Sequence, residues 1–277
     1  MKFNLREDAA RNMMLVAHRG FWGGNIPCNT VPAFDTALRH GADMIEIDLD
    51  RTADGKLVIF HPGMEQALLG FSESIERLPF DFVKQLRYIN IDNVPTQFGI
   101  PTFDEILERY KDKCYINVDK FWTHPREISD AIRAHGMADQ MVVKAKPKKE
   151  MLDIVEEFCA DMPYMAIISD EKELELLKGR RLNFVGSEVL FREDTARVAS
   201  AEFIKERHDK GEIVWCNSIV YNYRTVIAAD RTDDRAMCGD PEGSWGWIAD
   251  RGFDLMQTDM VLEAALFLEK TGRRKRR

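Results

Sequence analysis

Two acidic residues with a spacing of two stand out in the run Met44 to Leu49, which is otherwise apolar apart from them. Residues two apart on a strand share a face, so Glu46 and Asp48 project together while Ile47 points away. Neighbouring carboxylates repel each other unless a cation or a proton relieves the repulsion. An isolated pair is more often a solvated face, but the apolar surroundings favour a metal.

A third carboxylate, Asp119, follows the apolar run Cys114 to Val118, at the expected carboxyl end of another strand. On its own, a strand-end aspartate is more often a cap or a loop residue. Together with Glu46 and Asp48 it forms an oxygen set that suits a hard divalent ion and its waters. The sequence therefore predicts a site for one divalent cation, Mg²⁺ or Ca²⁺.

Two histidines follow strand-like runs: His18 ends the first, and His61 ends the run Leu57 to Phe60. A lone strand-end histidine is more often structural, but two that converge on one carboxylate cluster indicate acid–base chemistry. Phosphodiester cleavage needs a base for the nucleophile and an acid for the leaving oxygen, and imidazole suits both roles near neutral pH. The guanidinium fork of Arg19 can grip a phosphate, and Lys120 adds a point charge.

Apolar, β-branched runs recur between helix-like segments along the chain, which predicts βαβ units and a parallel sheet. The expected strands cover residues 14–17, 44–49, 57–60, 114–118, 141–143, 164–168, 183–189, 213–216 and 253–257. The expected helices cover residues 31–40, 102–110, 125–135, 148–159, 171–178 and 195–210.

One of these nine strands is an exception. The segment from Arg51 to Lys56 is too short for a parallel crossover, but its Asp54-Gly55 pair suits a hairpin turn. The run ending at His61 should therefore fold back antiparallel beside Glu46 and Asp48. Eight strands remain, which predicts an α/β TIM (β/α)8 barrel with a β-hairpin arm.

Two segments lack a clear period and are interpreted as insertions. Residues 62–101 fit a small, partly helical cap after the hairpin strand, and residues 218–247 fit a long loop with about one helix. Loops that follow barrel strands form the active-site face, so both insertions are expected to shape the pocket. The whole chain, 1–277, is predicted to be a single barrel domain.

Composition limits the partners. A formal net charge of −8 argues against a broad surface for nucleic acid or anionic lipid. No apolar stretch suits membrane insertion or a leader, and five cysteines without a CxxC spacing suggest a reducing compartment, so we expect a cytoplasmic protein. The basic tail, residues 273–277, is interpreted as a solvated end. The oligomeric state is left open.

Several short motifs follow one another in a fixed order. They are His18-Arg19-Gly20, Pro27-Cys28-Asn29-Thr30, Ala33-Phe34, Gly41-Ala42-Asp43, Glu46-Ile47-Asp48, Thr52, Asp54-Gly55, His61, Asp119-Lys120 and Gln257-Thr258-Asp259. This series resembles the signature of the glycerophosphodiester phosphodiesterase family, a branch of the phosphatidylinositol-phosphodiesterase-like TIM barrels. The resemblance spans residues 18 to about 260 and is densest over 18–61.

The resemblance implies a TIM-barrel enzyme that hydrolyses glycerophosphodiesters to glycerol 3-phosphate and an alcohol. By position, His18 and His61 match the acid–base pair, and Glu46, Asp48 and Asp119 match the ligands of Mg²⁺ or Ca²⁺. The positions matching substrate contacts in the family are Arg19, Lys120, Lys144 and Trp215. The partner implied is a small-molecule phosphodiester.

The sequence departs from the family pattern at three places. Cys28 stands where the family usually has Glu, Pro62 follows His61 where Asp is usual, and the third ligand is Asp119 instead of Glu. Aspartate as the third ligand is similar to the sphingomyelinase D branch, which keeps open a phospholipase or lyase that forms a cyclic phosphate. A nucleophilic Cys28 is disfavoured, because phosphoryl transfer with two imidazoles and a metal needs no thiol.

Two other classes remain as alternatives. A non-catalytic binder of phosphate esters would explain the changes at Cys28 and Pro62, although the retained histidines and carboxylates argue against it. A metal amidohydrolase barrel would typically begin with a His-x-His pair on the first strand, whereas this chain has His18-Arg19-Gly20.

Overall fold

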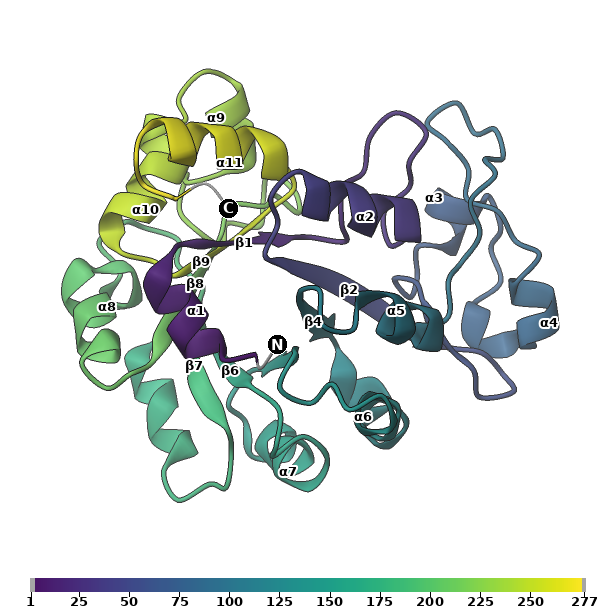
Figure 1. Cartoon of the computed structure of the whole chain (residues 1–277), viewed down its shortest axis with the longest axis horizontal. Coiled ribbons are helices and arrows are strands. Elements are labelled where there is room, and N and C mark those ends of the chain that lie inside the picture. The colour runs from purple at the N-terminus through teal and green to yellow at the C-terminus, as the bar shows by residue number, and fades with distance from the viewer. Residues whose placement is uncertain (1–2, 276–277) are drawn as a thin grey trace.

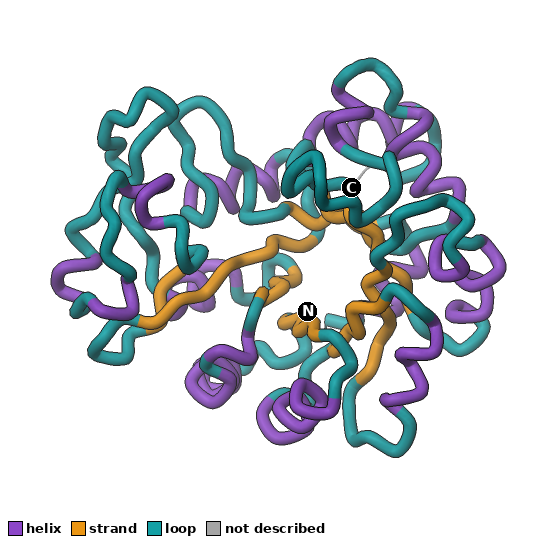
Figure 2. The backbone as a smooth tube through the Cα atoms, turned by 180° about the vertical axis from the view of Figure 1, so that it is seen from behind, coloured by secondary structure: helices purple, strands orange, loops and turns teal. Residues whose placement is uncertain are grey.

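Eight parallel strands close into a barrel in this computed structural model, which describes residues 3–275 (Figures 1 and 2). Each strand pairs with the next along the chain, and β9 returns to pair with β1. The barrel strands are β1 (Met14–Ala17), β2 (Met44–Arg51), β4 (Tyr115–Asp119), β5 (Met141–Ala145), β6 (Tyr164–Ile168), β7 (Phe184–Val189), β8 (Ile213–Asn217) and β9 (Leu255–Thr258). The predicted TIM barrel is confirmed.

Helices surround the barrel in the usual alternating order. The α-helices are α1 (Leu5–Arg11), α2 (Val31–Arg39), α3 (Glu65–Leu69), α4 (Phe80–Val83), α5 (Phe103–Tyr110), α6 (Pro125–Ala134), α7 (Lys149–Phe158), α8 (Ala201–His208), α9 (Asp233–Met237), α10 (Trp247–Arg251) and α11 (Val261–Lys270). Short 3₁₀ turns are η1 (Ile75–Arg77), η2 (Phe121–Thr123), η3 (Glu171–Leu177) and η4 (Arg197–Ala199), and η5 (Glu242–Gly246) is a π turn.

The predicted helices differ from the observed ones in their bounds, in their type and in two helices that were not predicted. The segment 195–210 divides into η4 and α8 because Ser200 caps a new helix by accepting a hydrogen bond from the Phe203 N–H. The segment 171–178 forms the 3₁₀ turn η3 instead of an α-helix. Helices α1 and α11 were not predicted, although both carry an apolar side that packs on the barrel.

The barrel interior is apolar near the amino ends of the strands and largely polar near their carboxyl ends. Met44, Tyr115 and Val142 belong to a buried inner cluster near the amino ends of their strands. Because side chains alternate with a period of two, Glu46 on β2 lies on the same face as Met44. The apolar layers therefore sit below the polar groups, which gather at the carboxyl end of the barrel.

Helix α1 closes the amino end of the barrel. Its residues Leu5 and Ala9 join the inner apolar cluster with Met14, Met44 and Trp215. In Figure 1 this helix crosses the barrel mouth that faces the viewer. The active-site face is thus the opposite end.

The hairpin arm projects from the barrel with the insertion beside it (Figure 1). Strand β3 (Leu57–Ile59) pairs antiparallel with β2, with Asp50 opposite Val58, as predicted. The insertion holds α3, η1 and α4 and packs its own small core, which includes Val58 and Tyr88, on the arm. The arm therefore carries a satellite core outside the main barrel.

Among residues 3–275, no helix has both the length and the apolar character needed to cross a membrane.

The side chains of Arg273 and Arg274 are docked, which corrects the predicted solvated end for these two residues, whereas Lys275 is exposed and residues 276–277 lie outside the described residues. Arg274 is 3% exposed, and its guanidinium lies 2.9 Å from Asp43 and 3.2 Å from Glu269. It also donates to the carbonyl of Gly41 at 2.7 Å, and Asp43 accepts from the Leu15 N–H on β1. The tail thus links β1 to the residues that directly precede β2.

We predict that Arg274→Met lowers the free energy of unfolding by about 3–5 kcal/mol, because removing one partner leaves a buried ion pair uncompensated. Urea unfolding followed by circular dichroism measures this loss. Arg77→Ala is the control, because the Arg77 side chain is 78% exposed, and it should change stability by less than about 0.5 kcal/mol. Equal stability of the two variants would contradict the role given to the tail.

Candidate active site

Three carboxylates gather at the carboxyl ends of β2 and β4. In the parallel register Asp48 lies opposite Asp119, and Glu46 lies two residues earlier on the same face as Asp48. One oxygen from each of Glu46, Asp48 and Asp119 lies within 4.8 Å of the other two. Glu46 and Asp48 are 3% and 2% exposed and so are shielded from water, whereas the Asp119 side chain is 31% exposed.

This cluster is electrostatically strained. Burial, together with the charge of Asp48, raises the pKa of Glu46 to about 8. Burial and the same neighbour also raise the pKa of Asp119. A divalent cation among these oxygens would relieve both effects, and the donor set is the all-oxygen type that Mg²⁺ and Ca²⁺ prefer. The residues therefore fit a metal.

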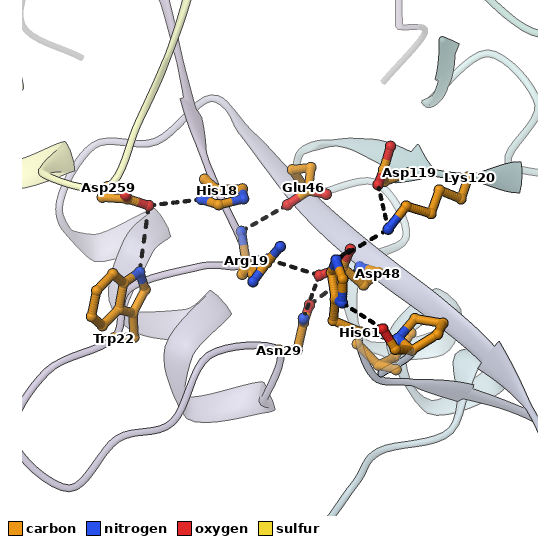
Figure 3. Close-up of polar contacts among 12 residues, drawn as sticks. His18, Arg19, Trp22, Asn29, Glu46, Asp48, His61, Asp119, Lys120 and Asp259 are labelled. Carbon is orange, nitrogen blue, oxygen red and sulfur yellow. Dashed lines mark hydrogen bonds and ion pairs between the residues drawn. The ribbon is translucent and has the colours of Figure 1, made fainter. Parts of the chain in front are cut away.

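Arg19 is bound to the cluster by its backbone and its side chain (Figure 3). Its N–H donates to Glu46 at 2.9 Å, and its Nε lies 2.9 Å from Asp48 Oδ2. The residue adopts a left-handed φ of 58°, which non-glycine residues seldom do, and Gly20 follows at φ 78°. A side chain at Gly20 would lie 2.8 Å from the Ala33 backbone, so only glycine fits this turn.

Asn29 fixes the other side of Asp48. Its side-chain amide donates to Asp48 Oδ2 at 2.8 Å, and its side-chain oxygen accepts from the Asp48 N–H at 3.3 Å. Asn29 is fully buried, with a left-handed φ of 57°. Its reciprocal bonds hold the carboxylate in one orientation.

His18 is held by Asp259 at the end of β9, with 2.8 Å between Nδ1 and the carboxylate. Burial by itself lowers the pKa of His18, but the hydrogen bond to Asp259 and the charges of Glu46 and Asp259 outweigh it and raise that pKa. The Trp22 indole N–H donates to the same carboxylate at 3.4 Å. Nδ1 thus carries a proton and Nε2 is left for the pocket.

His61 lies on the far side of the carboxylates. Its Nδ1 donates to the Pro62 carbonyl at 2.9 Å, and its Nε2 lies 3.9 Å from Asp48 and 3.1 Å from the Lys120 ammonium. Burial lowers the pKa of His61, and the charges of Arg19 and Lys120 lower it further. Lys120 is a third non-glycine residue with a left-handed φ, at 52°.

Part of this cluster lines a pocket of about 340 Å³. Its walls include both histidines, Arg19, Glu46, Asp119 and three lysines at 120, 144 and 146. The loop 218–247 contributes Tyr221 and Ile227, as predicted. None of the residues 62–101 lines this pocket, so the expected contribution of that insertion is wrong, because it packs on the outside of the arm.

Lys144 and Trp215 form a stacked pair in the barrel. Lys144 lines the pocket, but its ammonium is 2.6 Å from Glu188 and 3.9 Å from the centroid of the Trp215 ring. Trp215 is 0% exposed, and its indole N–H donates to Asn217 at 2.9 Å. Trp215 therefore lies below the pocket, which corrects its predicted contact with substrate.

Cys28 is poorly suited to act as a nucleophile. Burial raises the pKa of its thiol to about 11, and the charge of Arg19 offsets only part of this rise. The thiolate is the reactive form, so Cys28 is almost entirely unreactive near neutral pH.

Sequence reasoning missed several groups of this site, namely Glu188, Tyr221, Lys146 and the role of Asp259. Glu188 was detectable in principle, because it is a lone carboxylate within the apolar run 184–189. Asp259 and Asn29 belonged to motifs that were noted without a role. Tyr221 lies in a loop whose course no local pattern specifies.

The fold and the site together define a TIM-barrel protein with a centre of three carboxylates and two histidines at the carboxyl ends of the barrel strands. Residues 18–216 match the model of the glycerophosphoryl diester phosphodiesterase family, and the chain belongs to that family.

Curated relatives match over shorter segments. A glycerophosphodiester phosphodiesterase of Caldanaerobacter subterraneus is 31% identical over 140 residues, which are 48% of this chain and 51% of that protein. One from Bacillus altitudinis is 53% identical over 47 residues, 17% of this chain and 19% of the relative. The chain thus spans about half the length, or less, of the curated relatives it matches.

Solved structures match over nearly the whole fold. A glycerophosphoryl diester phosphodiesterase from Parabacteroides distasonis has a TM-score of 0.78 at 16% identity, covering 98% of this chain and 94% of its own. A phosphodiesterase from Oleispira antarctica, determined with the product sn-glycerol-3-phosphate, has a TM-score of 0.66 at 17% identity over 94% of this chain and 98% of its own. At these identities the likeness shows the fold.

We predict that Asp259→Asn lowers the pKa of His18, because the amide removes the charge that holds the protonated ring. Titration of the imidazole signals by NMR measures this change. Asp254→Asn is the matched control: Asp254 lies 2.8 Å from His208 and raises its pKa in the same way. That variant should lower the pKa of His208 and leave that of His18 unchanged. An unshifted His18 in Asp259→Asn would contradict the assignment.

Proposed function

We propose that this chain is a metal-dependent phosphodiesterase that hydrolyses glycerophosphodiesters to glycerol 3-phosphate and an alcohol. The observation that carries the proposal is that Glu46 and Asp119 line one pocket with His18 and His61. Asp48 lies within 4.8 Å of both carboxylates and 3.9 Å from His61. Family membership supports the proposal, as do the relatives that bear the same enzyme name and the Oleispira protein bound to sn-glycerol-3-phosphate.

The metal would be held by Glu46, Asp48 and Asp119, completed by water and substrate oxygens. Its chemistry when bound is to neutralise charge on the phosphoryl oxygens and to orient the ester. Three carboxylates suit either Mg²⁺ or Ca²⁺. Arg19 adds a guanidinium fixed against Asp48, and Lys120 adds an ammonium that can turn from His61 to the phosphate.

The two histidines take different roles in this scheme. His61 donates from Nδ1 to the Pro62 carbonyl, so its neutral Nε2 can accept the proton of the attacking water. His18, whose Nδ1 proton is held by Asp259, donates the Nε2 proton to the leaving alcohol oxygen. A phosphorus–oxygen bond forms to water, and the bond to the alcohol breaks. The lowered pKa of His61 and the raised pKa of His18 favour this division.

Lys144, which lines the pocket, is proposed as a substrate contact. Its pairing with Glu188 and its position over Trp215 fix the ammonium in one place. We assign Trp215 to positioning Lys144, because it does not reach the pocket surface.

The whole chain is proposed to act as one barrel domain on a small-molecule phosphodiester. The cytoplasmic location and the lack of nucleic-acid and membrane partners remain predictions from the sequence. The oligomeric state stays open.

The function is tested by incubating the purified chain with sn-glycero-3-phosphocholine and either Mg²⁺ or Ca²⁺, and following the products by phosphorus NMR. We expect the diester signal to convert to glycerol 3-phosphate, with no reaction after a chelator removes the metal. A cyclic phosphate that persists would instead indicate the lyase alternative. Tight binding of phosphate esters without turnover of any diester would make the protein a binder.

We predict that His18→Ala and His61→Ala each lower kcat by about 10²–10⁴-fold, the usual contribution of a general acid or base. Isothermal titration should show that both variants still bind the metal. Glu46→Gln should instead act mainly by weakening the affinity for the metal. His208→Ala is the control, because His208 pairs with Asp254 outside the pocket and should retain activity. Full activity of His61→Ala would refute the two-histidine scheme.

A further inference from the structure

A second cluster of metal-ligating groups lies outside the pocket. One atom from each of Asp50, Glu76 and His124 lies within 4.8 Å of the other two. They come from three parts of the fold: β2 where it enters the hairpin arm, the 3₁₀ turn η1 of the insertion, and the start of α6. The cluster is independent of the proposed phosphodiesterase activity.

Asp50 is the residue that points to a ligand. It is 1% exposed, and its Oδ1 accepts a hydrogen bond from the Arg51 N–H at 2.7 Å. Its Oδ2 is also buried but has no hydrogen-bond partner. A buried carboxylate oxygen without a partner is costly, and a bound cation would satisfy it.

The spacing of the other two ligands suits a small ion. His124 Nε2 lies 3.9 Å from Glu76 Oε1. Two ligands of a tetrahedral Zn²⁺, each about 2.0–2.1 Å from the metal, stand roughly 3.4 Å apart. The Glu76 side chain is 58% exposed, so it is free to close the remaining distance.

The nearby charges also allow a cation. Arg51 is the neighbouring positive group, but its guanidinium is paired with Glu127 at 2.8 Å. Glu65 is buried and accepts from the Ile75 N–H at 3.2 Å, which anchors the turn that carries Glu76. Acidic groups therefore predominate at this position.

The cluster is distinct from the carboxylate centre of the pocket. Asp50 is two residues beyond Asp48 on β2, a separation of about 7 Å along a strand. Ions that share one catalytic step stand about 3.5–4 Å apart. The second position would thus hold an ion of its own.

We propose that Asp50, Glu76 and His124 form a second divalent-cation site that fastens the insertion to the barrel. One imidazole with two carboxylates favours a borderline ion such as Zn²⁺ over Mg²⁺ or Ca²⁺. The ion would join η1 to the loop after β4, which also carries Lys120. Its role is structural, because none of the three residues lines the pocket.

The test counts Zn²⁺ bound per chain by equilibrium dialysis of chelator-treated protein. The full-length chain is compared with Glu76→Gln and His124→Asn, whose side chains are 58% and 13% exposed. Glu73→Gln is the matched carboxylate control on the same insertion. The same set is repeated in an Asp119→Asn background, which weakens the centre in the pocket. The test measures Zn²⁺ binding and not turnover. Its failure can therefore be distinguished from failure of the phosphodiesterase proposal.

We expect Glu76→Gln and His124→Asn each to bind one Zn²⁺ fewer per chain, or to bind it more than about tenfold more weakly. Glu73→Gln should match the unchanged protein in both backgrounds. Zn²⁺ should also raise the Tm of Asp119→Asn, and the added Glu76→Gln change should abolish that rise. Zn²⁺ stoichiometry and affinity that are the same in all variants would overturn the proposal.

Discussion

Repulsion among the buried carboxylates of β2 and β4 is the constraint on which the rest of the site depends. The parallel register places Asp48 opposite Asp119, and the two-residue period adds Glu46 on the same face. Burial prevents water from screening these charges, and the pKa of Glu46 rises to about 8 as a result. Such an arrangement is stable only with donors or a cation around it.

The surrounding residues supply those donors at some cost in backbone strain. Arg19, Asn29 and Lys120 all adopt left-handed backbone conformations. Each of them also contacts one of the carboxylates directly. Conformations of this kind persist where the surrounding structure enforces them, and they concentrate at functional sites. The strained turns direct an N–H to Glu46, an amide to Asp48 and an ammonium to Asp119.

Strand β2 organises both the barrel and the arm. Its barrel portion carries Glu46 and Asp48, while its extension pairs with β3 and brings His61 within 3.9 Å of Asp48. The same alternation continues to Asp50, which lies near Glu76 of the insertion and His124 at the start of α6. A single period-two pattern therefore serves the pocket and the junction between the barrel and the insertion.

The sequence by itself determined the barrel, the hairpin and most of the central groups, because each depends on local patterns. Alternating apolar runs mark strands, and the short Asp54-Gly55 connection excludes a parallel crossover, which brings His61 near Asp48. Tertiary structure alone decided the rest. Trp215 was matched to a pocket position through the family resemblance, but its depth in the barrel depends on all the strands at once. Asp259 reaches His18 only because β9 closes onto β1, and Arg274 reaches Asp43 only because the tail returns to the β1–β2 seam. Contacts between residues more than 200 positions apart depend on how the chain closes in space, which no local period encodes.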